Sequence, residues 1–358
     1  MEGTATPLRA LFEGWGAEFL CEFGVQRPLR VTGAGPEYDA ARTGVALADG
    51  GDRAWLELAG ADAEEFLQRT LSSDLRKLAP GVGQWSAMLD AKGHWVSDLL
   101  LFRMPGDAPA FGMDLPAVRG DAMDTRLEML HFSEDLSWRA REGARLLVLG
   151  PDADARLADL GIAAPAEFGA AEVQDRDGQT LLVLRRPDRG APCVELIGDP
   201  DTVAGHARAL HDAGAVPCGL VALDILRVEA FEPRWGDDFD EQDTLPNCNE
   251  WRRASLSKGC YAGQETVAKI DTYGEAPRQL CRLRFDGEPL PARGAELIDE
   301  DGKAVGAVRS WVWSPQAEQG IGLAMLRRRA AQDGGRLRAH VGDVESIATV
   351  EVPAKELG

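Results

Sequence analysis

The sequence predicts an α+β fold in which two related split α/β lobes precede a small C-terminal β-barrel. An internal repeat and a change of texture near residue 280 carry this prediction. The chain has 358 residues with an ordinary globular composition, and this length suits two or three domains. We place the lobes at residues 1–140 and 141–275 and the barrel at residues 276–358.

The repeat begins with two similar stretches, WLELAGADAEEFL (55–67) and RLLVLGPDADARL (145–157). Each reads as a short apolar strand, a break at glycine or proline, and a helix with an apolar face. Asp62 and Asp152 stand where each helix would begin, and aspartate is a favoured residue at that position.

A second echo follows each of these units. The turns LDAKGH (89–94) and QDRDGQ (174–179) precede the apolar runs 99–102 and 181–184, which predicts two hairpins. Helical spacing of apolar residues then predicts helices over 117–130 and 202–213. The order strand–helix–strand–strand–helix therefore occurs twice, and two such lobes usually form a ligand cleft where they meet.

From residue 280 onward, short alternating segments are separated by turns that contain glycine. Residues 281–285, 304–313 and 320–324 read as strands, and Asp286-Gly287 and Asp301-Gly302 are two of the turns. The boundary falls at the turn-rich stretch 271–279. This pattern predicts a small all-β sandwich or barrel.

The bulk composition excludes several classes of function. A net charge of −20 disfavours binding to a nucleic-acid backbone. The sequence has no apolar run of membrane-spanning length and no secretory signal at its start, and we expect a cytoplasmic protein without membrane or nucleic-acid partners. The six cysteines show no C-x-x-C spacing, so no metal site is predicted.

The stretch KGCYAGQET (258–266) carries the most unusual chemistry in the chain. Cys260 lies between two glycines, two residues after Lys258 and just before a predicted helix at Gln264. An ammonium group and a helix N-terminus both stabilise a thiolate, whereas Glu265 opposes it. The residues alone leave two interpretations open, namely an activated thiol or a glycine-rich turn with a buried cysteine.

This stretch resembles the signature of the YgfZ family of folate-binding proteins, K-G-C-[FY]-x-G-Q-E, at every fixed position. Further similarity lies at LAGADAEEFLQ (58–68), LDAKG (89–93) and LRVEA (226–230). GAVRSWVWSP (306–315) resembles the barrel shared with the larger glycine-cleavage T-protein family. The resemblance covers roughly residues 50 to 350.

The resemblance implies a T-protein-like cloverleaf, with the two lobes around a central folate channel and tetrahydrofolate as cofactor. It also implies an accessory role in iron–sulfur cluster assembly or repair, with client enzymes that include radical-SAM tRNA-modifying ones. The alternative is an aminomethyltransferase of the glycine cleavage system, with shared architecture. A third hypothesis is a non-catalytic scaffold with a vestigial pocket.

The same resemblance implies individual site residues. Cys260 stands at the required motif cysteine, where it would act as a nucleophile or as a transient ligand of iron or a cluster. Asp98 falls at the T-protein Asp-Asp-Leu stretch, where an aspartate is essential for one-carbon transfer. Glu195 lines up with a T-protein glutamate that contacts the pterin. Arg227 lines up with an arginine near the folate.

Three further residues complete the predicted binding site. Trp95 and Tyr261 could stack on a flat pterin, and Lys258 would lie beside the folate. The alternatives are ordinary: Trp95 in the core, Glu195 exposed on a strand, and Arg227 paired with Glu229 or Asp224 on a helix surface. The sequence also departs from the T-protein pattern, because Ser97 replaces the first aspartate and residues 1–30 have no counterpart.

Overall fold

The structure is a computed structural model that describes residues 3–106, 108–176, 178–188, 190–274, 276–287, 293–341 and 344–356. Its internal contacts divide the chain into two compact units. The first unit comprises Met1–Thr70, Asp74–Ser86 and Ser97–Leu226, and the second comprises Leu71–Ser73, Ala87–Val96 and Arg227–Gly358. The predicted three-domain division stays a prediction.

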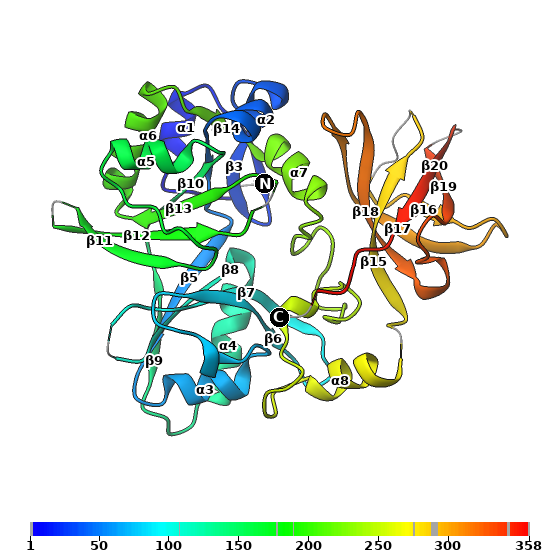
Figure 1. The fold of residues 1–358 in the computed structure, drawn as a ribbon, viewed down its shortest axis with the longest axis horizontal. Helices are drawn as coiled ribbons and strands as arrows, with labels where there is room; N and C mark the ends of the chain where they lie inside the picture. Colours follow the sequence, from blue (N-terminus) through cyan, green and yellow to red (C-terminus); the bar gives the residue numbers. More distant parts are fainter. Residues whose placement is uncertain are drawn as a thin grey trace. The chain divides into compact units, whose positions relative to one another are not determined.

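The first unit contains a six-stranded sheet with the order β11-β12-β13-β10-β4-β14 (Figure 1). Its neighbouring strands are antiparallel except for β4 and β14. The strands are β4 (Ala46–Asp49), β10 (Ala144–Leu149), β11 (Ala171–Arg176), β12 (Gln179–Arg186), β13 (Cys193–Gly198) and β14 (Val216–Cys218).

A five-stranded sheet has the order β6-β7-β8-β5-β9. Its strands are β5 (Arg53–Ala59), β6 (Gly83–Leu89), β7 (Trp95–Arg103), β8 (Ala110–Pro116) and β9 (Ser137–Arg141). A small third sheet holds β1 (Thr4–Ala5), β2 (Glu18–Glu22) and β3 (Val25–Arg30). The two larger sheets share an apolar cluster, in which the Trp55 ring packs against Phe102. The Trp55 ring occupies the space that a Cβ atom at position 112 would need, so glycine is required there.

Among the described residues, seven α-helices begin in the first unit, and the last of them ends in the second unit. They are α1 (Arg9–Gly14), α2 (Ala34–Thr43), α3 (Ala63–Thr70), α4 (Gly120–Leu130), α5 (Ala153–Asp159), α6 (Pro200–Asp212) and α7 (Leu220–Glu229). In α6 the side chain of Asp199 accepts hydrogen bonds from the first-turn N–H groups of Asp201 and Thr202, so the helix is capped at its start. No described helix is long and apolar enough to cross a membrane.

The predicted α+β class and the internal repeat are confirmed with one addition. The orders β5-α3-β6-β7-β8-α4 and β10-α5-β11-β12-β13-α6 run in parallel through the chain. Between its two helices each repeat contains three strands rather than the two predicted, and the additional strand is β8 in the first repeat and β13 in the second. In β8 the residues Gly112, Asp114 and Pro116 have low strand propensity, and this composition conceals the strand in the sequence.

The second unit contains the predicted barrel, which is closed by six strands in the order β15-β18-β17-β16-β19-β20 (Figure 1). They are β15 (Arg278–Phe285), β16 (Glu296–Ile298), β17 (Ala304–Ser314), β18 (Gln319–Arg327), β19 (Arg336–Val341) and β20 (Val344–Glu351). The barrel core is apolar and includes Cys281, Leu283, Phe285, Val308 and Leu326. Closure leaves no unpaired sheet edge.

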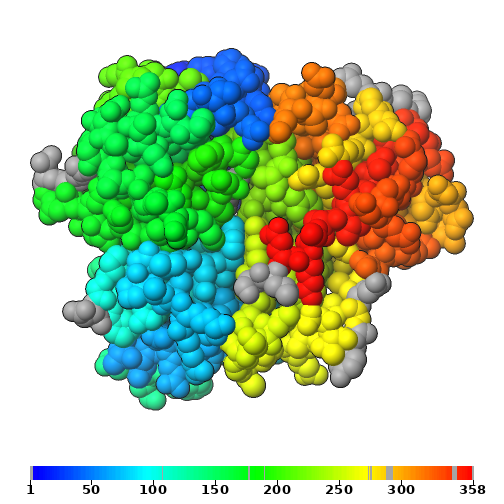
Figure 2. All heavy atoms as spheres, in the orientation of Figure 1, coloured from blue at the N-terminus to red at the C-terminus, as the bar shows by residue number. Residues whose placement is uncertain are grey.

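The C-terminal tail leaves the barrel and packs on a neighbouring part of the second unit. In Figure 2 its red atoms lie against the yellow residues near position 250. Asn249 donates to the backbone carbonyl of Ala354 at 2.9 Å, and the Lys355 ammonium lies 3.8 Å from the centre of the Trp251 ring. The tail thereby forms one wall of a pocket of about 260 Å³ that none of the predicted site residues lines.

Candidate functional site

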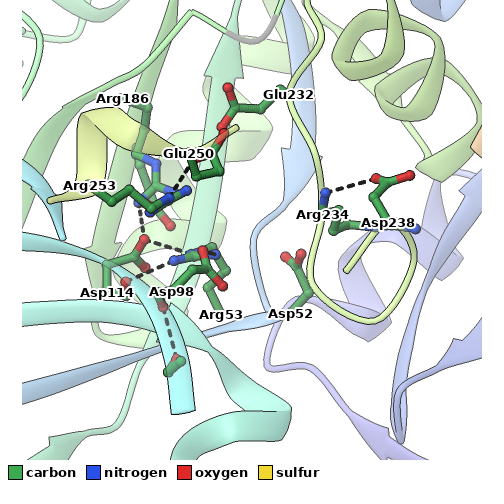
Figure 3. A network of polar contacts seen from close by, with 12 residues as sticks. Asp52, Arg53, Asp98, Asp114, Arg186, Glu232, Arg234, Asp238, Glu250 and Arg253 are labelled. Carbon is green, nitrogen blue, oxygen red and sulfur yellow. Dashed lines mark hydrogen bonds and ion pairs between the residues drawn. The ribbon is translucent and has the colours of Figure 1, made fainter. Parts of the chain in front are cut away.

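Six charged side chains from six strands converge within the first unit. We call them the charge cluster: Arg53 on β5, Asp98 on β7, Asp114 on β8, Arg145 on β10, Arg186 on β12 and Glu195 on β13. Five of the six are buried, and the Arg53 side chain is 11% exposed. Figure 3 shows four of them, Arg53, Asp98, Asp114 and Arg186, pointing toward one another.

Asp114 stands at the centre of the charge cluster and contacts all three arginines. Its Oδ2 accepts a hydrogen bond from Arg53 Nε at 2.7 Å, and its Oδ1 accepts one from Arg145 Nη2 at 2.6 Å. Arg186 Nη1 also donates to Oδ2. A single carboxylate therefore ties strands of the five-stranded sheet to strands of the six-stranded sheet.

The two carboxylates predicted from the sequence, Asp98 and Glu195, lie at the rim of these arginines. Asp98 Oδ2 lies 3.6 Å from Arg53 Nη1. Glu195 Oε1 accepts a hydrogen bond from Arg145 Nε at 2.7 Å, and Glu195 Oε2 lies 3.2 Å from Arg186 Nη1. Both predicted residues are thus buried and ion-paired, and Glu195 is not the exposed strand residue of the alternative.

The electrostatics of the charge cluster explain why Asp114 and Arg145 stay ionised although they are buried. Three guanidinium groups face three carboxylates, so the charges balance. Burial raises the pKa of Asp114, but the charges of Arg186, Arg53 and Arg145 outweigh it and hold that pKa well below its usual range. Burial lowers the pKa of Arg145, and the charges of Glu195 and Asp114 more than reverse this effect.

Two atoms of the charge cluster have hydrogen-bonding capacity left over. Among the described residues, neither Arg145 Nη1 nor Glu195 Oε2 has a hydrogen-bond partner, although both are buried. Buried polar atoms normally find partners, because an unmade bond costs about 1–3 kcal/mol. A buried donor and a buried acceptor that lack hydrogen-bond partners fit a planar ligand that offers a carbonyl and N–H groups on one edge, and Glu195 Oε2 keeps its ion pair with Arg186.

Arg227, at the end of α7, lies in the second unit and is buried rather than on a helix surface. Its Nη1 donates to Asp238 Oδ2 at 2.7 Å, and its Nη2 donates to Ser310 Oγ on β17 at 3.0 Å. Ser310 in turn donates to Asp238 Oδ1 at 2.6 Å. The backbone N–H of Arg234 also donates to Asp238, as Figure 3 shows. This ring of bonds fixes the plane of the Arg227 guanidinium group.

The 258–266 stretch also lies in the second unit and forms a turn before α8 (Gln264–Tyr273). The Lys258 ammonium donates to the backbone carbonyls of Leu71 and Ser73, at 2.7 and 2.6 Å. The Cys260 residue is exposed, so the alternative of a buried cysteine is excluded.

The two aromatic candidates, Tyr261 and Trp95, are both buried. Burial raises the pKa of Tyr261 to about 12, and its hydroxyl has no hydrogen-bond partner among the described residues. Trp95 is 1% exposed and its ring centre lies 5.0 Å from that of Phe239. Both rings therefore contribute to the packing of the second unit, and their stacking on a pterin stays a prediction.

The sequence reasoning missed Asp114 and the three arginines of the charge cluster. A signal for Asp114 was present, because it interrupts the apolar segment AFGMDLP as Asp98 interrupts WVSDLLL. A charged residue inside an apolar strand must face a partner, a ligand or water. The arginines lay at strand ends, where an exposed side chain is the ordinary expectation.

The fold and the charge cluster define a class of protein built from a duplicated α+β segment and a closed six-stranded C-terminal barrel. The chain belongs to the GCVT N-terminal domain family, whose model matches residues 8–250. The glycine cleavage T-protein C-terminal barrel domain matches residues 278–354. The predicted resemblance to the glycine-cleavage T-protein family is therefore confirmed.

Named relatives match the chain over nearly its whole length. An aminomethyltransferase of Lysinibacillus sphaericus is 27% identical over 97% of this chain and 96% of its own. One of Saccharopolyspora erythraea is 28% identical over 97% of each chain. The crystal structure of the glycine cleavage system aminomethyltransferase T of Bartonella henselae superposes with a TM-score of 0.90 at 24% identity, covering 97% of this chain and 96% of that one.

These comparisons correct the predicted function. The sequence led us to expect an accessory protein in iron–sulfur cluster assembly, and that expectation is wrong. Curated relatives that cover almost the entire chain are named aminomethyltransferases, which was the alternative. The YgfZ-like motif spans eight residues, whereas the similarity to aminomethyltransferases extends over 97% of the chain.

Proposed function

We propose that this chain is an aminomethyltransferase of the glycine-cleavage T-protein type that uses tetrahydrofolate as the one-carbon acceptor. The observation that carries the proposal is that Glu195 Oε2 and Arg145 Nη1 are buried without hydrogen-bond partners among the described residues, in a chain whose relatives are named aminomethyltransferases. The YgfZ-like motif at residues 258–265 would then mark a branch of this superfamily in which a thiol stands before α8.

The charge cluster has the donors and acceptors that a pterin requires. A pterin edge carries amidine-type N–H donors beside a carbonyl, and a carboxylate accepts two such donors as it does from arginine. Glu195 Oε2 would accept from the N–H groups, and Arg145 Nη1 would donate to the carbonyl. We propose that Arg227, Tyr261, Trp95 and Lys258 are further folate-binding residues.

Asp98 is the proposed proton acceptor in the transfer. The carbon of a sulfur-bound aminomethyl group would form bonds to two folate nitrogens, while the carrier thiol and ammonia leave. Each folate nitrogen loses one proton as its bond to carbon forms, and these two protons balance the thiol and the ammonia. The Asp98 carboxylate is 5% exposed and lies 3.6 Å from the Arg53 guanidinium, so the contact with Arg53 restricts its orientation. General base catalysis contributes about 10²–10⁴-fold to a rate.

The test is the formation of methylenetetrahydrofolate from an aminomethyl-lipoyl carrier protein. We expect activity in the wild-type chain and a loss of about 100-fold or more in Asp98→Asn, with tetrahydrofolate affinity nearly unchanged. The proposed transfer assigns no step to the exposed Cys260 thiol, so Cys260→Ala serves as the control and should retain activity within about twofold.

Two outcomes would contradict the proposal. If neither turnover nor calorimetric binding of tetrahydrofolate is detected for the wild-type chain, the scaffold hypothesis replaces it. If Cys260→Ala abolishes turnover while Asp98→Asn retains it, the reaction depends on the thiol and Asp98 is not the proton acceptor.

A further inference from the structure

Asp114 accepts hydrogen bonds from three guanidinium groups, although it was not among the site residues predicted from the sequence. Each of the three arginines also contacts a second carboxylate. Arg53 lies beside Asp98, whereas Arg145 and Arg186 lie beside Glu195. Within the charge cluster, the described contacts therefore connect Asp98 to Glu195 only by way of Asp114.

We propose that Asp114 is a positioning residue that holds Asp98 and Glu195 in fixed orientations through three shared arginines. The inference rests on the proposed function, because it assigns to Asp98 the transfer step and to Glu195 the binding of the pterin. The proposal gives the arginines different roles. Arg53 orients Asp98 for the transfer step, whereas Arg145 and Arg186 orient Glu195 for binding of the pterin.

The geometry favours positioning over simple support of the fold. Each arginine is bound on two sides by carboxylates, and a guanidinium group held this way keeps its plane. The six residues come from six strands in two sheets, so each orientation is determined by backbone that packing already holds rigid. A cluster needed only for stability could be replaced by apolar residues at little cost.

The chain supplies a matched control on the same strand. Arg185 precedes Arg186 on β12 and is 7% exposed, but it donates to Asp154 at 2.7 Å and to the Pro165 carbonyl, outside the charge cluster. Arg185→Gln and Arg186→Gln each remove one buried guanidinium group from β12. Asp114→Asn would leave three buried cations short of a negative charge and lower the stability of the fold, so the arginine variants carry the functional test.

The experiment measures tetrahydrofolate affinity by calorimetry and transfer rate by turnover, with thermal melts to establish folding. We expect Arg186→Gln to weaken affinity about tenfold or more and Arg185→Gln to change it less than about twofold. Arg53→Gln should lower kcat about tenfold or more while affinity stays within about threefold. The proposal is overturned if Arg186→Gln binds as tightly as Arg185→Gln, or if Arg53→Gln affects only stability.

A second arm separates this inference from the proposed function. If the wild-type chain binds no tetrahydrofolate, the proposed function fails, and the coupling of Asp98 with Glu195 is measured without ligand. The melting-temperature shifts of Asp98→Asn, Glu195→Gln and the double variant form a mutant cycle. A double shift that differs from the sum of the single shifts supports coupling through Asp114, and an additive one overturns it.

Discussion

At the scale of single residues, the first unit holds an unusual number of charges within apolar strands. Asp98 and Asp114 interrupt β7 and β8, and Glu195 interrupts β13. Such charges are costly to bury unless they are paired and hydrogen-bonded. In the charge cluster each carboxylate faces at least one guanidinium group, so a protein with a net charge of −20 still has a locally neutral site.

The low pKa of Asp114 predicts a pH dependence of stability. Because its folded pKa lies below the unfolded value of about 3.9, its contribution is complete above that pH and is lost as the pH falls through the folded pKa. Urea unfolding between about pH 5 and about pH 2 should show the free energy of unfolding of the wild-type chain falling toward that of Asp114→Asn.

The comparison of the wild-type chain with Asp114→Asn isolates the contribution of the Asp114 carboxyl group. Burial raises the pKa of Asp49, which acts with the opposite sign, but both proteins retain Asp49 and its effect cancels. Parallel curves for the wild type and Asp114→Asn would contradict the assignment of this pH dependence to Asp114.

At the scale of elements, the turn before α8 depends on its second glycine. Gly263 has a φ of +78°, in the left-handed region that side chains rarely adopt. A Cβ there would also lie 2.7 Å from the backbone oxygen of Asp90 and 2.8 Å from the Gly93 Cα. The close approach of these two turns is what fixes the start of α8.

Gly263→Ala should therefore destabilise the chain, whereas Gly259→Ala in the same motif should not. Gly259 does not have a positive φ, and a Cβ built on it meets no described atom within 4 Å. We expect a loss of about 1–3 kcal/mol in the free energy of unfolding for Gly263→Ala and less than about 0.5 kcal/mol for Gly259→Ala, measured by denaturant titration. Equal losses would show that the left-handed conformation is not the constraint.

At the scale of the whole molecule, the barrel has the features of a self-contained domain. Its core cluster lies between Cys281 and Val350, and its six strands leave no open edge. It makes polar contacts with the end of α7 and with the 234–240 loop, as in the bonds of Ser310 with Asp238 and of Ser314 with Glu229. Polar contacts of this kind can be exchanged for water when the barrel is separated.

Residues 276–358 should consequently fold when expressed alone. We expect a strand-type circular dichroism spectrum and one cooperative thermal transition, because the apolar core is retained in full. The predicted barrel boundary is tested at the same time. A spectrum of an unfolded chain, or melting without cooperativity, would show that the barrel depends on the rest of the second unit.

The sequence by itself determined the elements whose signals are local. The hairpin turns, the alternating barrel strands and the start of α8 were predicted from neighbouring residues, and the structure confirms them. Asp98 and Glu195 were identified through resemblance alone. Their arginine partners were not, because a side chain that lies at a strand end carries no local sign of burial.

Only the tertiary structure decided which charges meet. Arg145 and Asp114 are 31 residues apart in the chain, and Arg186 and Asp114 are 72 apart. They contact each other because the two sheets share an apolar cluster, an arrangement that depends on strand order and register rather than on any one segment. Local propensity can place a residue on a strand, but the partner of a buried charge is set by the packing of strands that are distant in the sequence.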